Sequence, residues 1–402
     1  MQIDRLISEG IALARSGAFT QALSCFDRAL ELEPSNAVAL SCKGSILTNM
    51  HQPSQALEYY DKALAIEPIN VGVLIKKGIV LTRLHKSTQA LESFDKALAR
   101  EPNNVDGLIG KGTVLNNQLS YAQALDCFDK ALELEPNNVS VLIQKGTVLL
   151  NTSRFYEALQ IFGKTLIIEP NNVEALVKKG IALTRLREIP QALDCFDKAL
   201  ELDPNNVLAL QWKSNYLFRL RRFDEALEYV DKALAIEPDN LNAMIMKANT
   251  LAAANRKYEK AMSLIKKVLS IVPDDSRAIL VEGFILFKSN KYDDALSRFD
   301  HILQRNEFNI DAWYYKGAVK TAVKDYDDAL RCYEEAIEIN PKFAEAYNAK
   351  ADVLFRKKEK QKAIDEVKKA IEIDPALASA PENLTKLIVS TENQRHEFMH
   401  FG

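Results

Sequence analysis

The sequence has little of what marks membrane, secreted or nucleic-acid-binding proteins. No stretch approaches the roughly 20 consecutive apolar residues that a membrane-spanning helix needs. The opening residues, MQIDRLISEG, have neither the basic start nor the apolar run of a signal peptide. Lysine and arginine total 52 against 55 aspartates and glutamates, and a net charge of -3 gives no general attraction to nucleic acid. We therefore expect a cytoplasmic protein that binds neither membranes nor nucleic acids.

Cysteine and histidine are also scarce, with five of each among 402 residues. No histidine keeps a constant spacing from a cysteine, so nothing supports a Cys–His nucleophile. The segment from His396 to His400 reads HExxH, the pattern of a zinc peptidase, but only two residues follow it and a chain end offers no shaped cleft. We expect no metal, no cofactor and no enzymatic activity. The cysteines that share one register of the repeat described next should be too far apart for disulfides; they are Cys25, Cys127, Cys195 and Cys332.

Proline recurs with a constant period of 34 residues from Pro34 to Pro238. The series continues, one residue late, at Pro273 and ends with Pro341 and Pro375. Eleven units of 34 residues, with one extra residue in the eighth, therefore cover residues 3–377. A period of this length indicates a stack of small repeated units and not several independent domains.

Each unit has the pattern of two amphipathic helices joined by a turn. Position 8 of the unit is always glycine, alanine or serine, position 20 is always alanine, and apolar residues recur three or four positions apart around both. Glycine inside a helix costs about 1 kcal/mol relative to alanine, so its recurrence indicates a close contact between helices. Asparagine shortly after the proline predicts the N-cap of the next helix. Position 7 is lysine in nine of the eleven copies, for which we expect a partly exposed side chain.

These features together resemble the tetratricopeptide repeat, with its small residue at position 8, alanine at 20 and 27, aromatic residue at 24 and proline at 32. The fourth copy, VDGLIGKGTVLNNQLSYAQALDCFDKALELEPNN at 105–138, fits well except that Leu108 replaces the usual large aromatic residue. The resemblance implies an all-α solenoid, a right-handed superhelix of eleven helical hairpins. We expect irregular packing at 241–309, a capping helix at 378–392 and a mobile tail at 393–402.

The resemblance also implies that the first helices line a concave groove that holds segments of other proteins. Positions 5, 9 and 13 lie on the side of the first helix that faces away from its core positions, and should face the groove. Amide and guanidinium groups there can bind peptide backbone and carboxylates, and an apolar strip at position 5 can offer pockets for side chains. The candidate residues are Arg83, Asn117, Asn151, Arg185 and Arg219 at position 13, Asn215 and Asn249 at position 9, and Ile75, Ile109, Ile143 and Val177 at position 5.

A purely structural interpretation of the same residues stays open. Arginine and asparagine near a helix C-terminus also satisfy unpaired carbonyls, and the residues at position 5 can be buried by the next helix. The lysine–asparagine clamp of chaperone-binding members is not reproduced, because positions 5 and 9 of the third copy are Ile75 and Ile79. We expect a non-enzymatic scaffold that binds a protein or peptide segment in its groove. The alternative is a structural protein that forms homo-oligomers through residues 241–309 or its terminal helix.

Overall fold

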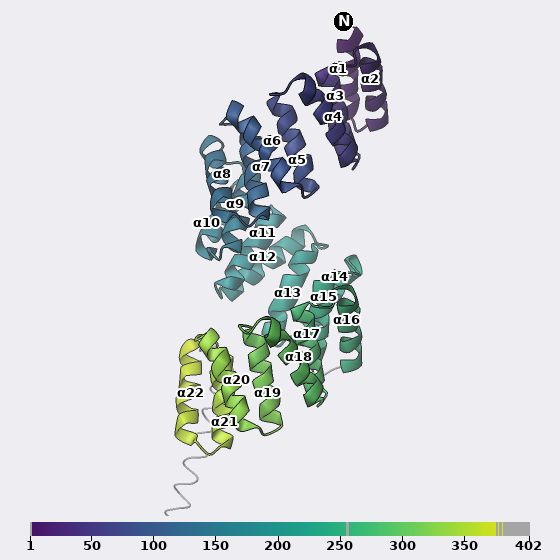
Figure 1. The fold of residues 1–402 in the computed structure, drawn as a ribbon. Coiled ribbons are helices and arrows are strands. Elements are labelled where there is room, and N and C mark those ends of the chain that lie inside the picture. The colour runs from purple at the N-terminus through teal and green to yellow at the C-terminus, as the bar shows by residue number, and fades with distance from the viewer. Residues whose placement is uncertain (1, 255–256, 375–376, 378–379, 381–402) are drawn as a thin grey trace, which may run out of the picture. The chain divides into compact units, whose positions relative to one another are not determined.

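The computed structural model describes residues 2–254, 257–374, 377 and 380. Within these residues all regular secondary structure is helical, in 22 helices, which confirms the all-α repeat architecture (Figure 1). Most of the expected capping helix at 378–392, the tail at 393–402 and the HExxH segment lie outside the described residues.

The helices alternate between a first and a second helix of each hairpin. The first helices are α1 Gln2–Arg15, α3 Ala37–Asn49, α5 Val71–Arg83, α7 Val105–Asn117, α9 Val139–Asn151, α11 Val173–Arg185, α13 Val207–Arg219, α15 Leu241–Ala253, α17 Ser276–Lys288, α19 Ile310–Ala322 and α21 Ala344–Arg356. The second helices are α2 Phe19–Leu32, α4 Pro53–Ile66, α6 Ser87–Arg100, α8 Tyr121–Leu134, α10 Phe155–Ile168, α12 Ile189–Leu202, α14 Phe223–Ile236, α16 Tyr258–Ile271, α18 Tyr292–Arg305, α20 Tyr326–Ile339 and α22 Lys360–Ile373.

Local side chains and turn geometry set where the helices begin and end. The predicted asparagine N-caps are confirmed: the Oδ1 atom of Asn138, for example, accepts a hydrogen bond from the backbone N–H of Val141 at 3.2 Å. Between the two helices of each hairpin, one residue adopts a positive φ, such as Ser153 at 58° or Gly17 at 80°. This left-handed residue reverses the chain, and the following N–H bonds back to the first helix, as from Arg154 to the carbonyl of Leu149 at 2.8 Å.

The contact between the two helices of a hairpin depends on a matched pair at positions 8 and 24. In eight hairpins position 8 is glycine, and a methyl group added there would lie 2.6 to 2.8 Å from the ring of the residue at position 24, as at Gly146 against Phe162. In the other three hairpins position 8 carries a side chain and position 24 is aliphatic: the pairs are Ser214 with Val230, Ala248 with Ile265, and Ala351 with Val367. A ring at position 24 therefore occurs with glycine at position 8, and a smaller aliphatic residue at position 24 occurs with a side chain at position 8. The reason is that the space between the two helices has a fixed volume.

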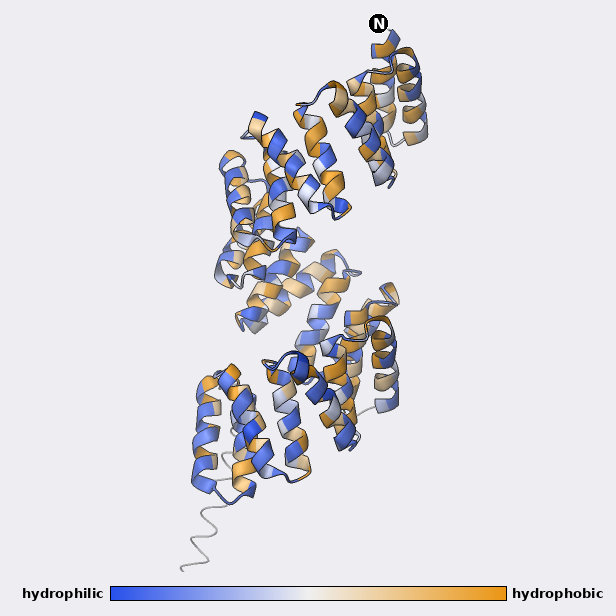
Figure 2. Cartoon of the chain, in the orientation of Figure 1, coloured by the Kyte–Doolittle hydropathy of each residue, from blue (hydrophilic) through white to orange (hydrophobic). Residues whose placement is uncertain are grey.

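Two compact units make up the chain, residues 1–204 and 205–402. Within each unit, a second helix packs on the first helix of the next hairpin, and consecutive first helices such as α5 and α7 also touch. Consecutive second helices do not touch one another in the described part of the chain. The first helices therefore form the inner face of each unit and the second helices its outer face. Apolar and polar residues alternate along every helix, as burial on one side requires (Figure 2).

Candidate functional site

The inner face of unit 205–402 contains a pocket between the first helices α13 and α15. Its volume is about 250 Å³, and Ser214, Asn215, Phe218 and Arg219 of α13 line it together with Met246, Asn249 and Thr250 of α15. Three of these residues, Asn215, Arg219 and Asn249, were candidates from the sequence alone. The one-turn spacing between positions 9 and 13 brings Asn215 and Arg219 together on one side of α13.

Some polar side chains of this pocket form hydrogen bonds within the protein, and others do not. Buried Ser214 donates its hydroxyl to the carbonyl of Ala226 at 2.8 Å, and Thr250 donates to the carbonyl of Met246 at 2.8 Å. By contrast, no hydrogen bond or ion pair in the described residues engages the side chains of Asn215, Arg219 or Asn249. These three side chains offer amide donors and acceptors and a guanidinium group, which suit backbone carbonyls, backbone N–H groups and carboxylates.

In unit 1–204, the candidates at position 13 end the first helices on the same inner face. Arg83, Asn117, Asn151 and Arg185 are all exposed. The residue before Asn117 adds a group that was not among the candidates, because the buried Oδ1 atom of Asn116 has no hydrogen-bond partner. An unsatisfied buried acceptor costs about 1–3 kcal/mol, so this oxygen atom lowers the stability of the free protein.

The apolar strip at position 5 lies deeper than a set of open pockets would. Ile75, Ile143 and Val177 are buried, with 7%, 7% and 2% of their surface exposed, and Ile109 is half-buried. Ile75 belongs to a core cluster with Phe94 and Val114, so it contributes to the contact between consecutive repeats. These side chains therefore form the floor of the inner face, and the free polar groups stand above it.

Further along unit 205–402 the inner face becomes aromatic and acidic. Tyr315 of α19 contacts Phe284 of α17, with ring centroids 5.2 Å apart, and Tyr314 at 5.3 Å. Burial raises the pKa of Tyr314 to about 12. Loss of solvent, and then the like charge of Glu345, raise the pKa of Asp311 above its usual range. No ion pair in the described ranges engages Asp311 or Glu345, so this region differs in charge from the pocket at α13 and α15.

The recurrent lysine at position 7 has a structural partner that the sequence analysis missed. It pairs with the acidic residue at position 25 of the preceding repeat, as in Lys77–Asp61 at 2.6 Å and Lys111–Asp95 at 2.7 Å. Other ion pairs of this kind that connect consecutive hairpins are Lys43–Asp27, Lys145–Asp129, Lys247–Asp231, Lys316–Asp300 and Lys350–Glu334. Aspartate recurs at position 25 in seven of the eleven copies, and this recurrence was the signal that would have predicted this inter-repeat ladder of ion pairs.

The cysteines, the acidic side chains and the helices also bear on disulfides, metal binding and membranes. All five cysteines are free thiols, and burial raises the pKa of Cys332 to about 11. Residues 2–254 and 257–374 contain no group of three or more His, Cys, Asp or Glu side chains placed to hold a metal ion. Among the helices described, none is long and apolar enough to cross a membrane.

Comparison with known proteins identifies the repeat. Four family models, each described as a tetratricopeptide repeat, match the chain; their matches are at 7–70 and 75–139, at 127–160, 195–228 and 332–365, at 217–278 and 252–318, and at 173–206 and 310–343. No curated protein matches.

Among solved structures, a tetratricopeptide repeat protein from Parabacteroides merdae has a TM-score of 0.51 at 18% identity, over 62% of this chain and 98% of that one. Yeast Tom70 has a TM-score of 0.47 at 17% identity, over 98% of this chain and 96% of its own. YrrB, described as a TPR protein with an unusual peptide-binding site, has a TM-score of 0.40 at 28% identity, over 47% of this chain and 97% of its own. Proteins built from this repeat generally mediate protein–protein interactions and typically act as non-enzymatic scaffolds. The matches to the family models show that this chain belongs to the tetratricopeptide repeat family.

Proposed function

We propose that this protein is a non-enzymatic scaffold that binds an extended segment of a partner protein along the inner face of its repeats. The observation that carries the proposal is the pocket between α13 and α15, where Asn215, Arg219 and Asn249 have no partner in the described part of the chain. Three unsatisfied polar side chains in one concave site suit a ligand that supplies the missing hydrogen bonds.

The chemistry of the pocket favours a peptide. An asparagine side chain can donate to one backbone carbonyl and accept from one backbone N–H, which is the pattern that an extended chain presents. Arg219 can bind a carboxylate of the segment with two parallel hydrogen bonds. In unit 1–204, the exposed side chains of Arg83, Asn117 and Asn151 provide groups of the same kind.

The test is affinity capture from a lysate of the source organism, followed by measurement of the dissociation constant with each purified partner. The groove variant carries Asn215→Ala and Arg219→Glu. A control variant makes the same kinds of change outside the pocket, with Gln304→Ala on α18 and Lys368→Glu on α22, where both side chains are exposed.

We expect the wild type and the control variant to bind at least one captured partner with the same dissociation constant. The groove variant should bind that partner at least 10-fold more weakly. Circular dichroism must show equal helicity for all three proteins. If every captured partner binds the groove variant as tightly as the control, the inner face of α13 and α15 is not the binding surface and the proposal is wrong.

A further inference from the structure

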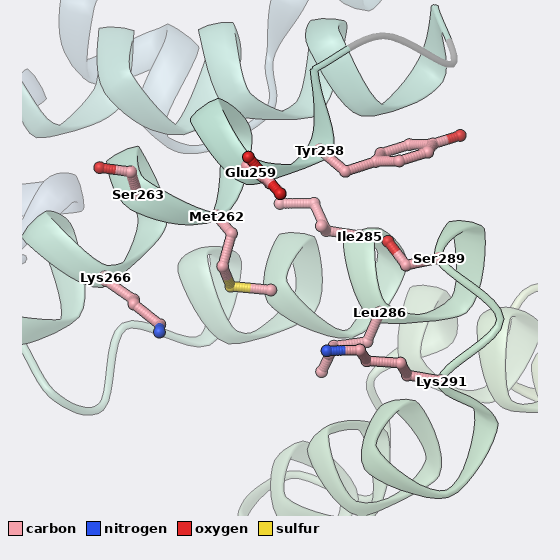
Figure 3. A pocket seen from close by; sticks show the side chains of 9 residues that line it. All are labelled: Tyr258, Glu259, Met262, Ser263, Lys266, Ile285, Leu286, Ser289 and Lys291. Carbon is pink, nitrogen blue, oxygen red and sulfur yellow. The ribbon is translucent and has the colours of Figure 1, made fainter.

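A second pocket lies where the eighth repeat meets the ninth, between the second helix α16, the C-terminal end of α17 and the turn that follows α17. Its volume is about 390 Å³, and its lining residues are Tyr258, Glu259, Met262, Ser263 and Lys266 of α16 with Ile285, Leu286, Ser289 and Lys291 (Figure 3). None of these residues belongs to the inner-face candidates, so any function of this pocket goes beyond the proposed one.

The side chain of Ser263, which lines the pocket, is small. Ser263 occupies position 22 of its repeat, where six of the eleven copies carry aspartate or glutamate, including Glu58, Glu92 and Glu228. Serine is shorter than these acidic residues, and it lines the pocket together with half-buried Met262 and Leu286 and fully buried Ile285. The floor is therefore apolar, and the lining carries one carboxylate, Glu259, against the two lysines Lys266 and Lys291.

Two lysines without partners flank this apolar floor. At this junction the inter-repeat ladder is reversed, because Glu282 occupies position 7 and Lys266 occupies position 25. Buried Glu282 pairs instead with the guanidinium of Arg298 at 3.0 Å. Neither Lys266 nor Lys291 has a hydrogen bond or ion pair in the described residues. In Figure 3 they extend toward the pocket from opposite sides, with Met262 between them.

The charge of the surrounding helix adds to this local excess. α16 carries three lysines and one glutamate, whereas the preceding second helix α14 carries one lysine and four acidic residues. Lys267 of α16 is paired with Asp239 at 2.9 Å, whereas Lys266 of the same helix lines the pocket. Lys266 and Lys291 are both exposed, so an anion can reach them without a change in the fold.

We infer that this pocket docks an acidic segment of a partner protein, one that presents a large apolar side chain beside a carboxylate. The apolar side chain lies on Met262, Ile285 and Leu286, and the carboxylate lies between Lys266 and Lys291. The volume is that of a small binding cleft, and the charge complementarity selects an acidic partner over a basic one. Because α16 is a second helix, a partner docked here leaves the inner face free for another segment.

Nuclear magnetic resonance of methionine methyl groups tests this site directly. The chain has six methionines, and labelling their ε-methyl carbons gives one signal for Met262 in this pocket and one for Met246 in the pocket at α13 and α15. The probe is the acetylated peptide amide Glu-Leu-Leu-Glu, compared with Gln-Leu-Leu-Gln and Glu-Ala-Ala-Glu. We expect the first peptide to shift the Met262 signal and to bind at least 5-fold more tightly than the other two.

Substitutions then separate the pocket from general charge. Lys266→Gln with Lys291→Gln should weaken binding of the Glu-Leu-Leu-Glu peptide at least 5-fold. Lys260→Gln with Lys267→Gln, on the same helix but outside the pocket, should change it less than 2-fold. Ser263→Glu restores the side chain that other repeats carry and should abolish binding without unfolding the chain. Higher ionic strength should weaken the wild-type interaction, because the lysines are exposed.

Several outcomes would overturn the inference. The pocket is not a docking site if Met262 does not respond to the acidic peptide, and it does not select an anion if the glutamine peptide binds equally well. Octanoate that binds over 100-fold more tightly than the peptide, with the same dependence on the lysines, would identify a small amphiphile as the ligand. A dimer in sedimentation that the Lys266→Gln, Lys291→Gln variant loses would identify a second copy of the chain. None of these outcomes bears on the inner face, which the Met246 signal reports separately.

Discussion

Single side chains in this protein act mainly across the boundary between repeats. The lysine at position 7 lies 16 residues after its acidic partner in the sequence, as in Lys77 and Asp61, so each ion pair joins one hairpin to the next. In the fifth copy, Gly163 takes the place of the acidic residue, and Lys179 has no ion-pair partner in the described residues. A β-carbon added at Gly163 would have no atom of another element within 4 Å, so the position has room for a side chain.

Gly163→Asp should therefore stabilise the protein. The replacement of a mid-helix glycine contributes a few tenths of a kcal/mol, and an ion pair with Lys179 adds at most about 1 kcal/mol at low salt. Urea unfolding of the wild type, the Gly163→Asp variant and both in a Lys179→Gln background measures the two contributions. The part due to the ion pair should vanish in 1 M salt and in the Lys179→Gln background. If aspartate has the same effect with and without Lys179, the ladder does not extend to this position.

Pairs of helices are joined by the contact between positions 8 and 24. Gly146 lies so close to Phe162 that a β-carbon on it would be 2.6 Å from the ring. The ring of Phe162 is fully buried in a cluster with Leu149 and Ala158, so it cannot move away without disturbing that packing. In α21 and α22 the same place is filled by Ala351 and Val367, so two solutions of similar total volume occur in one chain.

Gly146→Ala should destabilise the protein by about 1–3 kcal/mol through overpacking, despite the higher helix propensity of alanine. Phe162→Val should cost a similar amount or more, because it leaves a cavity. The double variant reproduces the pair found in the last hairpin. Its loss of unfolding free energy should be smaller than the sum of the losses in the two single variants. Unfolding free energies in a double-mutant cycle give this coupling. Additive effects would mean that the two positions do not share one space.

At the scale of the whole molecule, stability should be local, because each hairpin packs against its neighbours alone. The chain forms two compact units, 1–204 and 205–402, each with apolar clusters of its own, such as the one around Phe128 and the one around Ile265. Neither unit needs a residue from the other to complete these clusters.

Fragments 1–204 and 205–402, produced separately, should therefore each remain helical. Each should unfold cooperatively in urea. If the full chain unfolds in one step, the m-value of each fragment should be roughly half that of the full chain, because the m-value scales with the surface exposed on unfolding. Circular dichroism during urea titration measures both quantities. A fragment that is unfolded in buffer where the full chain is folded would show that stability is not local to its unit.

The repeat itself could be predicted from the sequence because it depends on local rules. The 34-residue period, the asparagine N-caps and the apolar spacing all act within about one hairpin, and the helices begin and end where these signals place them. The candidate residues Asn215, Arg219 and Asn249 could be found for the same reason, since helical periodicity alone selects the side of the first helix that carries them.

The sequence by itself thus determined that the chain is a stack of helical hairpins and which face of each first helix points inward. Only the tertiary structure decided which side chains on those faces are free. Ile75 packs with Val114 of the next repeat, Lys77 is held by Asp61 of the previous one, and Lys266 is unpaired because Arg298 engages Glu282. The physical reason is that these contacts join residues of different hairpins, so they depend on how the hairpins stack and not on the pattern within any one of them.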